Sequence, residues 1–278
     1  MEVTVQSHTG MLRDHNEDNH LVDARNGIFL VADGMGGHQA GEVASKLCVE
    51  TVHARLVDMP RFADANLEIV VQGVKDAIHE ANREIRRSAR SSPERANMGT
   101  TLVLLLDRGD AAVIAHLGDS RIYRLREGHL QALTRDHSLL QEQVGAGFIT
   151  HEEARQSHNR NLVTRALGVE ENVDPEVNIV DVRPGDCFLL CSDGLNTMVA
   201  DADIELVLAE LEANPPLAAK VLVGVANDNG GHDNVTVALA WSPARAAPPD
   251  EVAAGSRSVA PAPEKGLFAR LFGWLFGK

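Results

Sequence analysis

Aspartates stand at the ends of several short apolar runs in this sequence, each beside a small or turn-forming residue. Asp33-Gly34 follows FLVA, Asp119-Ser120 follows IAHLG, Asp193-Gly194 follows FLLCS, and Asp233-Asn234 precedes VTVALAW. A further acidic cluster is Asn16-Glu17-Asp18. Turn chemistry explains any one of these aspartates, because Asp beside Gly is common where a strand ends. It does not explain why every such position carries Asp rather than Asn, Ser or Gly, so the repetition predicts carboxylates that converge in the fold.

Converging carboxylates constrain the chemistry of the protein. Like charges within a few ångströms of one another must take up protons or be compensated. The sequence has no HExxH motif and no cysteine cluster, and oxygen ligands favour Mg²⁺ or Mn²⁺ over zinc. A pair of such ions bridged by one aspartate would lower the pKa of a water and place hydroxide opposite a phosphoryl group. The Gly-rich run from Asp33 to His38 allows the Gly34 carbonyl to approach an ion, although a tight strand-to-helix turn explains the glycines equally well.

The apolar runs predict an α+β fold. Strands are expected at 2–5, 27–32, 101–107, 111–116, 121–125, 177–182, 186–192 and 235–241, because these runs are bounded by turn residues and several are rich in Val, Ile, Leu and Phe. Helices are expected to begin near Gly41 and near Asp64. In the second helix the apolar residues recur at spacings of three and four and mark one buried face, which comprises Leu67, Val70, Val71, Val74, Ile78, Ala81 and Ile85. Helices lie between clusters of strands rather than after each strand, which favours antiparallel sheets.

Charge and cysteine usage narrow the class of protein. The chain of 278 residues has 40 acidic and 26 basic residues, a formal net charge of −14, so a nucleic-acid partner is not expected. Three cysteines without a CxxC pair argue against a disulfide framework. The N-terminus lacks the pattern of a signal peptide, and no apolar stretch is long enough to span a membrane. These features predict a cytoplasmic protein.

The last part of the chain differs from the body. Residues 243–265 are rich in Pro, Ala and Ser and are predicted to form a flexible linker after a body that ends near residue 242. Residues 266–278 read GLFARLFGWLFGK, and as a helix they would place their Leu, Phe and Trp side chains on one broad face. This amphipathic segment predicts attachment to a membrane surface. Docking onto the body or into the groove of a partner would use the same face and stays open.

The order and spacing of the motifs resemble the metal-dependent protein phosphatases of the PPM/PP2C type, in the bacterial branch. The resemblance covers nearly the whole body. Its motifs are T-G-x-x-R-x-x-N-E-D from Thr9 to Asp18, D-G-M-G-G-H from Asp33, M-G-T-T from Met98, G-D-S-R from Gly118, D-H-S-L from Asp136, R-N-x-x-T-R-A-L-G from Arg160, S-D-G-L from Ser192 and G-x-D-N-x-T from Gly231.

The resemblance implies a central sandwich of two antiparallel β-sheets flanked by α-helices, with a metal channel at one end. It implies that Asp33 bridges two Mg²⁺ or Mn²⁺ ions, that the Gly34 carbonyl and water complete one of them, and that Asp193 and Asp233 hold the other. Glu17 and Asp18 would support the cluster through metal-bound water. Asp119, together with Asp193, matches the position of a weaker third metal.

Two residues are candidates for direct roles in the reaction. Arg13 lies five residues before Asp18, and its planar guanidinium suits bidentate capture of the substrate phosphate; a surface salt bridge is the alternative. His38 is the candidate general acid, since an unperturbed histidine pKa near 6.5 suits that role. Many eukaryotic relatives carry the histidine where this chain has Met35, and a local hydrogen bond at a helix start is the competing explanation for His38.

The segment 136–168 resembles the mobile flap of bacterial relatives and is expected to select substrates. Together these features predict a phosphatase that removes phosphate from serine or threonine in proteins by attack of a water bridging two divalent metals, opposing a Ser/Thr kinase. No CxxxxxR loop is present, which disfavours a cysteine nucleophile. The alternatives are a hydrolase of small phosphoesters and a tethered interaction module without catalysis.

Overall fold

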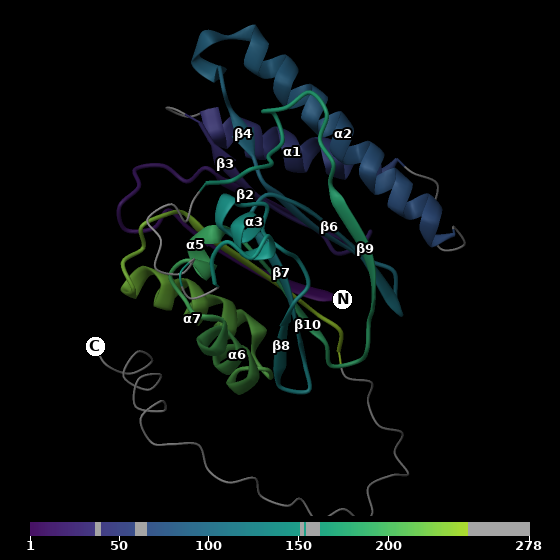
Figure 1. Cartoon of the computed structure of the whole chain (residues 1–278). Helices are drawn as coiled ribbons and strands as arrows, with labels where there is room; N and C mark the ends of the chain where they lie inside the picture. The colour runs from purple at the N-terminus through teal and green to yellow at the C-terminus, as the bar shows by residue number, and fades with distance from the viewer. Residues whose placement is uncertain (37–39, 59–65, 151–152, 154–161, 244–278) are drawn as a thin grey trace, which may run out of the picture. The chain divides into compact units, whose positions relative to one another are not determined.

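The computed structural model describes residues 1–36, 40–58, 66–150, 153 and 162–243 (Figure 1). Residues Met1–Ala244 form one compact unit. The predicted linker and amphipathic segment, 243–265 and 266–278, lie outside the described residues except for residue 243, as does His38. The boundary near residue 242 stays a prediction.

Two antiparallel sheets form the centre of the described unit. The first has the strand order β1-β11-β10-β7-β8. Its strands are β1 (Glu2–His8), β7 (Arg121–Arg126), β8 (His129–Ala132), β10 (Cys187–Cys191) and β11 (Val235–Trp241). The second sheet has the order β2-β3-β5-β6-β9, and β4 pairs with β3. Its strands are β2 (Asp18–Asp23), β3 (Ile28–Met35), β4 (Gly99–Thr100), β5 (Leu102–Asp107), β6 (Ala111–Leu117) and β9 (Glu176–Asp181).

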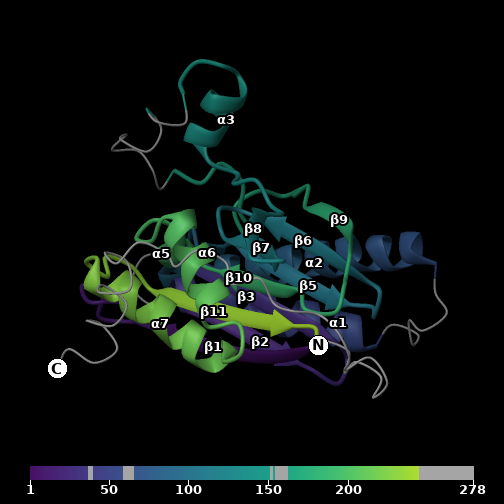
Figure 2. The ribbon, with the colours of Figure 1, turned by 90° about the horizontal axis from the view of Figure 1, so that it is seen from below.

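Helices cover the outer face of each sheet, which gives four layers (Figures 1 and 2). Against the second sheet pack α1 (Ala40–Val57) and α2 (Leu67–Ser91), and against the first pack α6 (Asp201–Glu210) and α7 (Pro215–Asp228). The shorter elements are η2 (Pro93–Arg95), α3 (Leu139–Gly145) and α5 (Asp193–Asn196).

The side-chain period of two along β3 builds both cores of the molecule. Phe29 and Val31 point between the sheets, where they meet Phe188 and Leu190 of the opposite sheet. Leu30, on the other face of β3, packs with the buried face of the helices. A strand buried on both faces reads as a continuous apolar run, which is why FLVA is recognisable in the sequence.

The predicted sandwich of two antiparallel sheets flanked by helices is therefore confirmed. All eight predicted strands exist with ends shifted by at most a few residues, and the run 235–241 is β11 without a change. One detail differs: β3 continues to Met35, so Asp33 lies inside the strand rather than after it. The sequence reading missed β2, β4 and β8 and the helices α6 and α7.

Two further expectations concern cysteine and membranes. All three cysteines are free and buried, and burial raises the pKa of the Cys48, Cys187 and Cys191 thiols. They are therefore core residues rather than nucleophiles. In the part of the chain that the structure describes, no helix is both long and apolar enough to cross a bilayer.

Candidate active site

Both sheets contribute aspartates to one group of carboxylates. Asp18 begins β2 and Asp33 lies directly opposite it in β3. Asp119 comes just after β6, Asp193 begins α5 after β10, and Asp233 stands two residues before β11. The charges of Asp18, Asp193, Asp119 and Asp233 all act on Asp33. The predicted convergence of these five aspartates is thus what the fold produces.

Asp33 is at the centre of this carboxylate group. Burial, followed by the charges of the four neighbouring aspartates, raises its pKa well above the ordinary value. The pKa of Asp193 is also raised, first by burial and then by the charges of Asp119 and Asp233. Hydrogen bonding to Asp33 partly offsets the shifts of Asp193 and Asp18. Protein groups alone leave this concentration of negative charge uncompensated.

Asp18 is the most deeply anchored member of the group. Its Oδ2 accepts hydrogen bonds from Ser192 Oγ at 2.8 Å and from Thr236 Oγ1 at 2.7 Å. Burial raises the pKa of Asp18 to about 6 in spite of these two donors. The two hydroxyls fix one carboxylate oxygen and leave the other free to face the group.

The backbone of Asp33 is held by two threonines. Thr101 Oγ1 accepts a hydrogen bond from the Asp33 N–H at 3.0 Å, and the Thr101 N–H donates to the Asp33 carbonyl at 2.9 Å. Thr100 Oγ1 donates to the same carbonyl at 2.8 Å. These contacts fix the position from which the Asp33 side chain projects.

Gly34 is a position that only glycine can occupy. A Cβ built there would lie 2.1 Å from the Gly41 carbonyl oxygen and 2.6 Å from that of Glu17. Its N–H donates to the Glu17 carbonyl at 3.2 Å. The glycine thus permits α1 and the segment before β2 to close around β3, whichever ligand its own carbonyl binds.

Glu17 and the N-terminal loop are tied to the opposite sheet through Asn234. The Asn234 side chain accepts from the Glu17 N–H at 2.8 Å and donates to the carbonyls of Thr9 and His15 at 2.8 and 2.9 Å. Burial raises the pKa of Glu17, while a hydrogen bond from the Gly41 N–H opposes that shift. Glu17 therefore borders the carboxylate group, as predicted, and its role through water stays a prediction.

Arg13 lies at the exposed edge of the group. Its guanidinium contacts Asp233 Oδ2 at 2.7 Å, and its side chain is 50% exposed. An arginine that touches a candidate metal ligand and also faces solvent is well placed for an incoming anion. The salt bridge considered as the alternative is also present, so the two interpretations share one geometry.

Asp119 belongs to the group but faces a different neighbourhood. Burial and the charge of Asp136 raise the pKa of Asp119 to about 6. Arg121 holds Asp136 through two hydrogen bonds of 2.7 and 2.8 Å. A cavity of about 640 Å³ is lined by Asp119, Asp193, residues 197–201 and part of the segment predicted as the flap.

The described part of the predicted flap begins at Asp136 and includes α3. Figure 2 shows α3 standing away from the layers of the sandwich. The Ser138–Val163 bridge joins the two ends of this segment. Residues 151–152 and 154–161 lie outside the described residues, so a role of 136–168 in substrate selection stays a prediction.

The sequence reading assigned no role to several residues that support the site. Ser192, Thr236, Thr101 and Asn234 all hold candidate ligands or their backbone. Each lies within the motifs S-D-G-L, M-G-T-T or G-x-D-N-x-T. The available signal was a hydroxyl or amide side chain next to a candidate ligand, since buried carboxylates require donors.

The donor set fits divalent cations. Among the described residues, Asp18 Oδ1 and Asp193 Oδ1 are buried carboxylate oxygens without any hydrogen-bond partner. Such atoms are costly unless something binds them. Hard cations with oxygen ligands satisfy both these atoms and the excess charge around Asp33.

Comparison with known proteins supports the same class. The family model described as Protein phosphatase 2C matches residues 11–225. The Serine/threonine phosphatase stp of Listeria innocua is 38% identical over 242 residues, which cover 86% of this chain and 95% of that protein. The crystal structure of the Mycobacterium tuberculosis serine/threonine phosphatase PstP/Ppp superposes with a TM-score of 0.80 at 36% identity and covers 87% of this chain and 98% of that one.

A second solved structure bears on the metal. The catalytic domain of the serine threonine protein phosphatase PstP, solved in complex with two manganese ions, gives a TM-score of 0.75 at 36% identity. It covers 86% of this chain and 96% of that chain. Two sheets with a carboxylate group between them thus define the class of metal-dependent phosphatases. This chain belongs to the protein phosphatase 2C family.

Proposed function

We propose that this chain is a serine/threonine protein phosphatase that uses two divalent ions, Mg²⁺ or Mn²⁺, with a weaker third. The observation that carries the proposal is the group of buried aspartates around Asp33, two of which have unpartnered oxygens. Its similarity to serine/threonine phosphatases over most of the chain supports the substrate class.

The residues divide the work according to their positions. Asp33, the Gly34 carbonyl, Asp193 and Asp233 would hold the two ions, with Asp18 and Glu17 supporting them through water. When bound, the ions supply an activated water and a counter-charge for the phosphoryl group. Arg13, beside Asp233, binds and orients the phosphate. Asp119 with Asp193 is the proposed site of the third ion, and His38 is the proposed general acid.

The proposal predicts phosphopeptide hydrolysis that depends on metal. The purified full chain is expected to release phosphate from phosphoserine and phosphothreonine peptides in Mn²⁺ or Mg²⁺ and to lose that activity in excess EDTA. Returning Mn²⁺ should restore it, which separates metal removal from unfolding. Full activity in EDTA would contradict the mechanism.

The comparison of substrates decides between a protein phosphatase and a hydrolase of small phosphoesters. We expect kcat/KM for a phosphopeptide to exceed that for para-nitrophenyl phosphate, because the 640 Å³ cavity beside Asp119 and Asp193 offers contacts to residues around the phosphoserine. Equal values would favour the small-ester alternative. No activity on either substrate would favour the interaction module.

We infer further that phosphoproteins of an opposing Ser/Thr kinase are the substrates, and that residues 266–278 bring the enzyme to the inner face of the cell membrane. In this sequence, apolar and aromatic side chains accompany Lys265, Arg270 and Lys278. Such a pattern binds anionic lipid surfaces.

A pair of full-length variants tests the membrane proposal. Replacing Leu271 and Trp274 by Ser should reduce sedimentation with anionic vesicles at least severalfold, since both lie on the apolar face. Ala269→Ser, on the opposite face, is the matched control and should bind like the parent chain. Equal vesicle binding by all three proteins would refute membrane attachment.

A further inference from the structure

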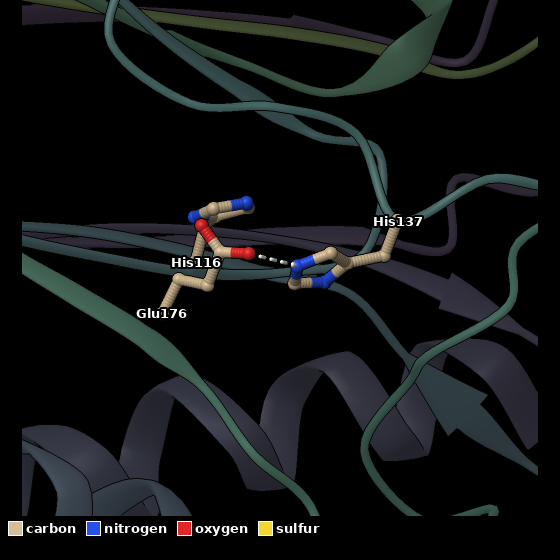
Figure 3. A group of neighbouring side chains, drawn as sticks. All are labelled: His116, His137 and Glu176. Carbon is tan, nitrogen blue, oxygen red and sulfur yellow. Dashed lines mark hydrogen bonds and ion pairs between the residues drawn. The ribbon is translucent and has the colours of Figure 1, made fainter. Parts of the chain in front are cut away.

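Three buried or half-buried side chains form a cluster outside the carboxylate group. His116 lies in β6, His137 follows β8, and Glu176 begins β9. The two histidine rings are stacked with their centroids 4.6 Å apart and their planes inclined by 20°. Figure 3 shows Glu176 reaching toward the His137 ring. We call these three residues the histidine cluster.

The hydrogen bonds assign the proton positions in the cluster. The Gly118 N–H donates to His137 Nδ1 at 3.1 Å, so this nitrogen carries a lone pair. The His137 proton is then on Nε2, which lies 3.2 Å from Glu176 Oε1 and donates to it. His116 Nε2 lies 2.9 Å from the Arg135 carbonyl and must also be protonated. Both rings are therefore neutral and each donates through Nε2.

Two histidines and a glutamate could in principle hold a transition metal. The geometry argues against it here. A metal at His137 Nε2 would displace the proton of that nitrogen while Nδ1 still accepts from Gly118, which would require an imidazolate or the loss of the Gly118 bond. Nearly parallel stacked rings also cannot direct in-plane lone pairs at one ion without rotating. The cluster is better described by its hydrogen bonds.

Those hydrogen bonds make His137 a junction between the active site and the predicted flap. Its backbone N–H donates to the Gly118 carbonyl at 2.9 Å, so main chain and side chain together hold Gly118 on both sides. Gly118 has φ +110° and directly precedes Asp119. The His137 carbonyl accepts from the Thr164 N–H at 2.8 Å, at the far end of the predicted flap.

We propose that His137 is a positioning residue for this reaction. Its Nδ1 holds the Gly118-Asp119 turn at a fixed distance from the base of the flap, and Glu176 keeps the proton on Nε2 so that Nδ1 stays an acceptor. The site for the third ion at Asp119 is then preformed. This last point rests on the proposed function, whereas the contact with Gly118 does not.

Two substitutions separate the ends of the imidazole ring. In His137→Asn the amide oxygen replaces Nδ1 and can accept from Gly118, but contact with Glu176 is lost. In His137→Gln the longer amide reaches Glu176 and leaves Gly118 without its acceptor. His129→Gln, at an exposed position of β8, is the matched control.

We expect His137→Gln to lose protection of the Gly118 amide against hydrogen exchange and to weaken the weakest of the Mn²⁺ sites measured by calorimetry by about 10-fold or more, as for residues that support a metal ligand. His137→Asn and His129→Gln should resemble the parent chain in both measurements. If the chain proves not to be a phosphatase, the Gly118 amide still reports on the contact.

Three results would overturn the proposal. Equal impairment by Asn and Gln would mean that the ring only fills space. Parental behaviour of both variants would mean that the contact with Gly118 positions nothing. A bound Zn²⁺ lost in both would make the cluster a metal site. Nitrogen NMR of the parent chain needs no variant: a protonated Nδ1 on His137 would also refute the assignment.

Discussion

Replacing Asp33 by Asn is expected to lower phosphopeptide hydrolysis in Mn²⁺ by on the order of 10³-fold. The carboxylate at the centre of the group is the proposed bridge between two ions, and its loss removes several kcal/mol of stabilisation of transition-state charge, at about 1.4 kcal/mol for each tenfold. Asn has the same shape and retains a donor and an acceptor for Asp18 and Asp193. A loss of activity would therefore report on charge rather than on packing.

The same substitution is expected to raise the stability of the metal-free protein. Burial and four neighbouring aspartates raise the pKa of Asp33 in the folded state, whereas the unfolded chain has an ordinary value near 4. Between those two pKa values the folded state binds more protons, so the free energy of unfolding falls as the pH rises. The Asp33→Asn variant has no titrating group at this position, and its advantage should grow from pH 4 upward and be absent below it.

Chemical denaturation in EDTA at several pH values measures this difference, with Asp203→Asn on the exposed side of α6 as the control. The control should change neither activity nor the pH dependence of stability. An Asp33→Asn variant that stays fully active, or that is less stable than the parent without metal at pH 8, would show that Asp33 is not a repelled carboxylate awaiting cations.

Replacing Arg13 by Ala is expected to reduce kcat/KM for phosphopeptides by about 10- to 100-fold. A hydrogen bond to a charged group contributes about 1.5–3 kcal/mol, and the guanidinium is the cation that contacts Asp233. Arg13→Lys should recover part of the loss, because it restores the charge without the planar fork. The measurement is steady-state kinetics at saturating Mn²⁺.

The role in phosphate binding makes a distinct claim about metal. Mn²⁺ affinity of Arg13→Ala should be unchanged or higher, since the arginine competes with cations for Asp233. Arg87→Ala, on the exposed face of α2 with a side chain 78% exposed, is the control. Unchanged kcat/KM in Arg13→Ala would reduce this arginine to a surface salt bridge.

The sequence predicted those parts of the fold in which burial leaves a pattern. The strands β3, β5 and β10 are buried on both faces and appear as apolar runs, and α2 shows helical spacing because only one face of it is buried. By contrast, β2 and β8 lie at sheet edges and read DNHLVD and HLQA, so little apolar signal marks them. The helix α7 is apolar on most sides and lacks the contrast that periodicity requires.

The site was predictable in composition but not in geometry. Asp18, Asp33, Asp119, Asp193 and Asp233 were all selected from the sequence as candidate ligands, and the fold brings their charges together. The direct pairing of Asp18 with Asp33 was not predicted, because it depends on the register of a strand that the pattern did not reveal. The histidine cluster was not predicted either, since His116, His137 and Glu176 meet only when β6, the loop after β8 and β9 assemble.

A calorimetric titration of the metal-free parent chain with Mn²⁺ tests the central claim most directly. Two ions should bind tightly and a third more weakly, tight binding should largely disappear in Asp33→Asn, and phosphopeptide hydrolysis should rise with occupancy of the first two sites. A parent chain that binds no Mn²⁺, or an Asp33→Asn variant that binds the same two ions with the same affinity, would contradict the assignment of this carboxylate group as the catalytic metal centre.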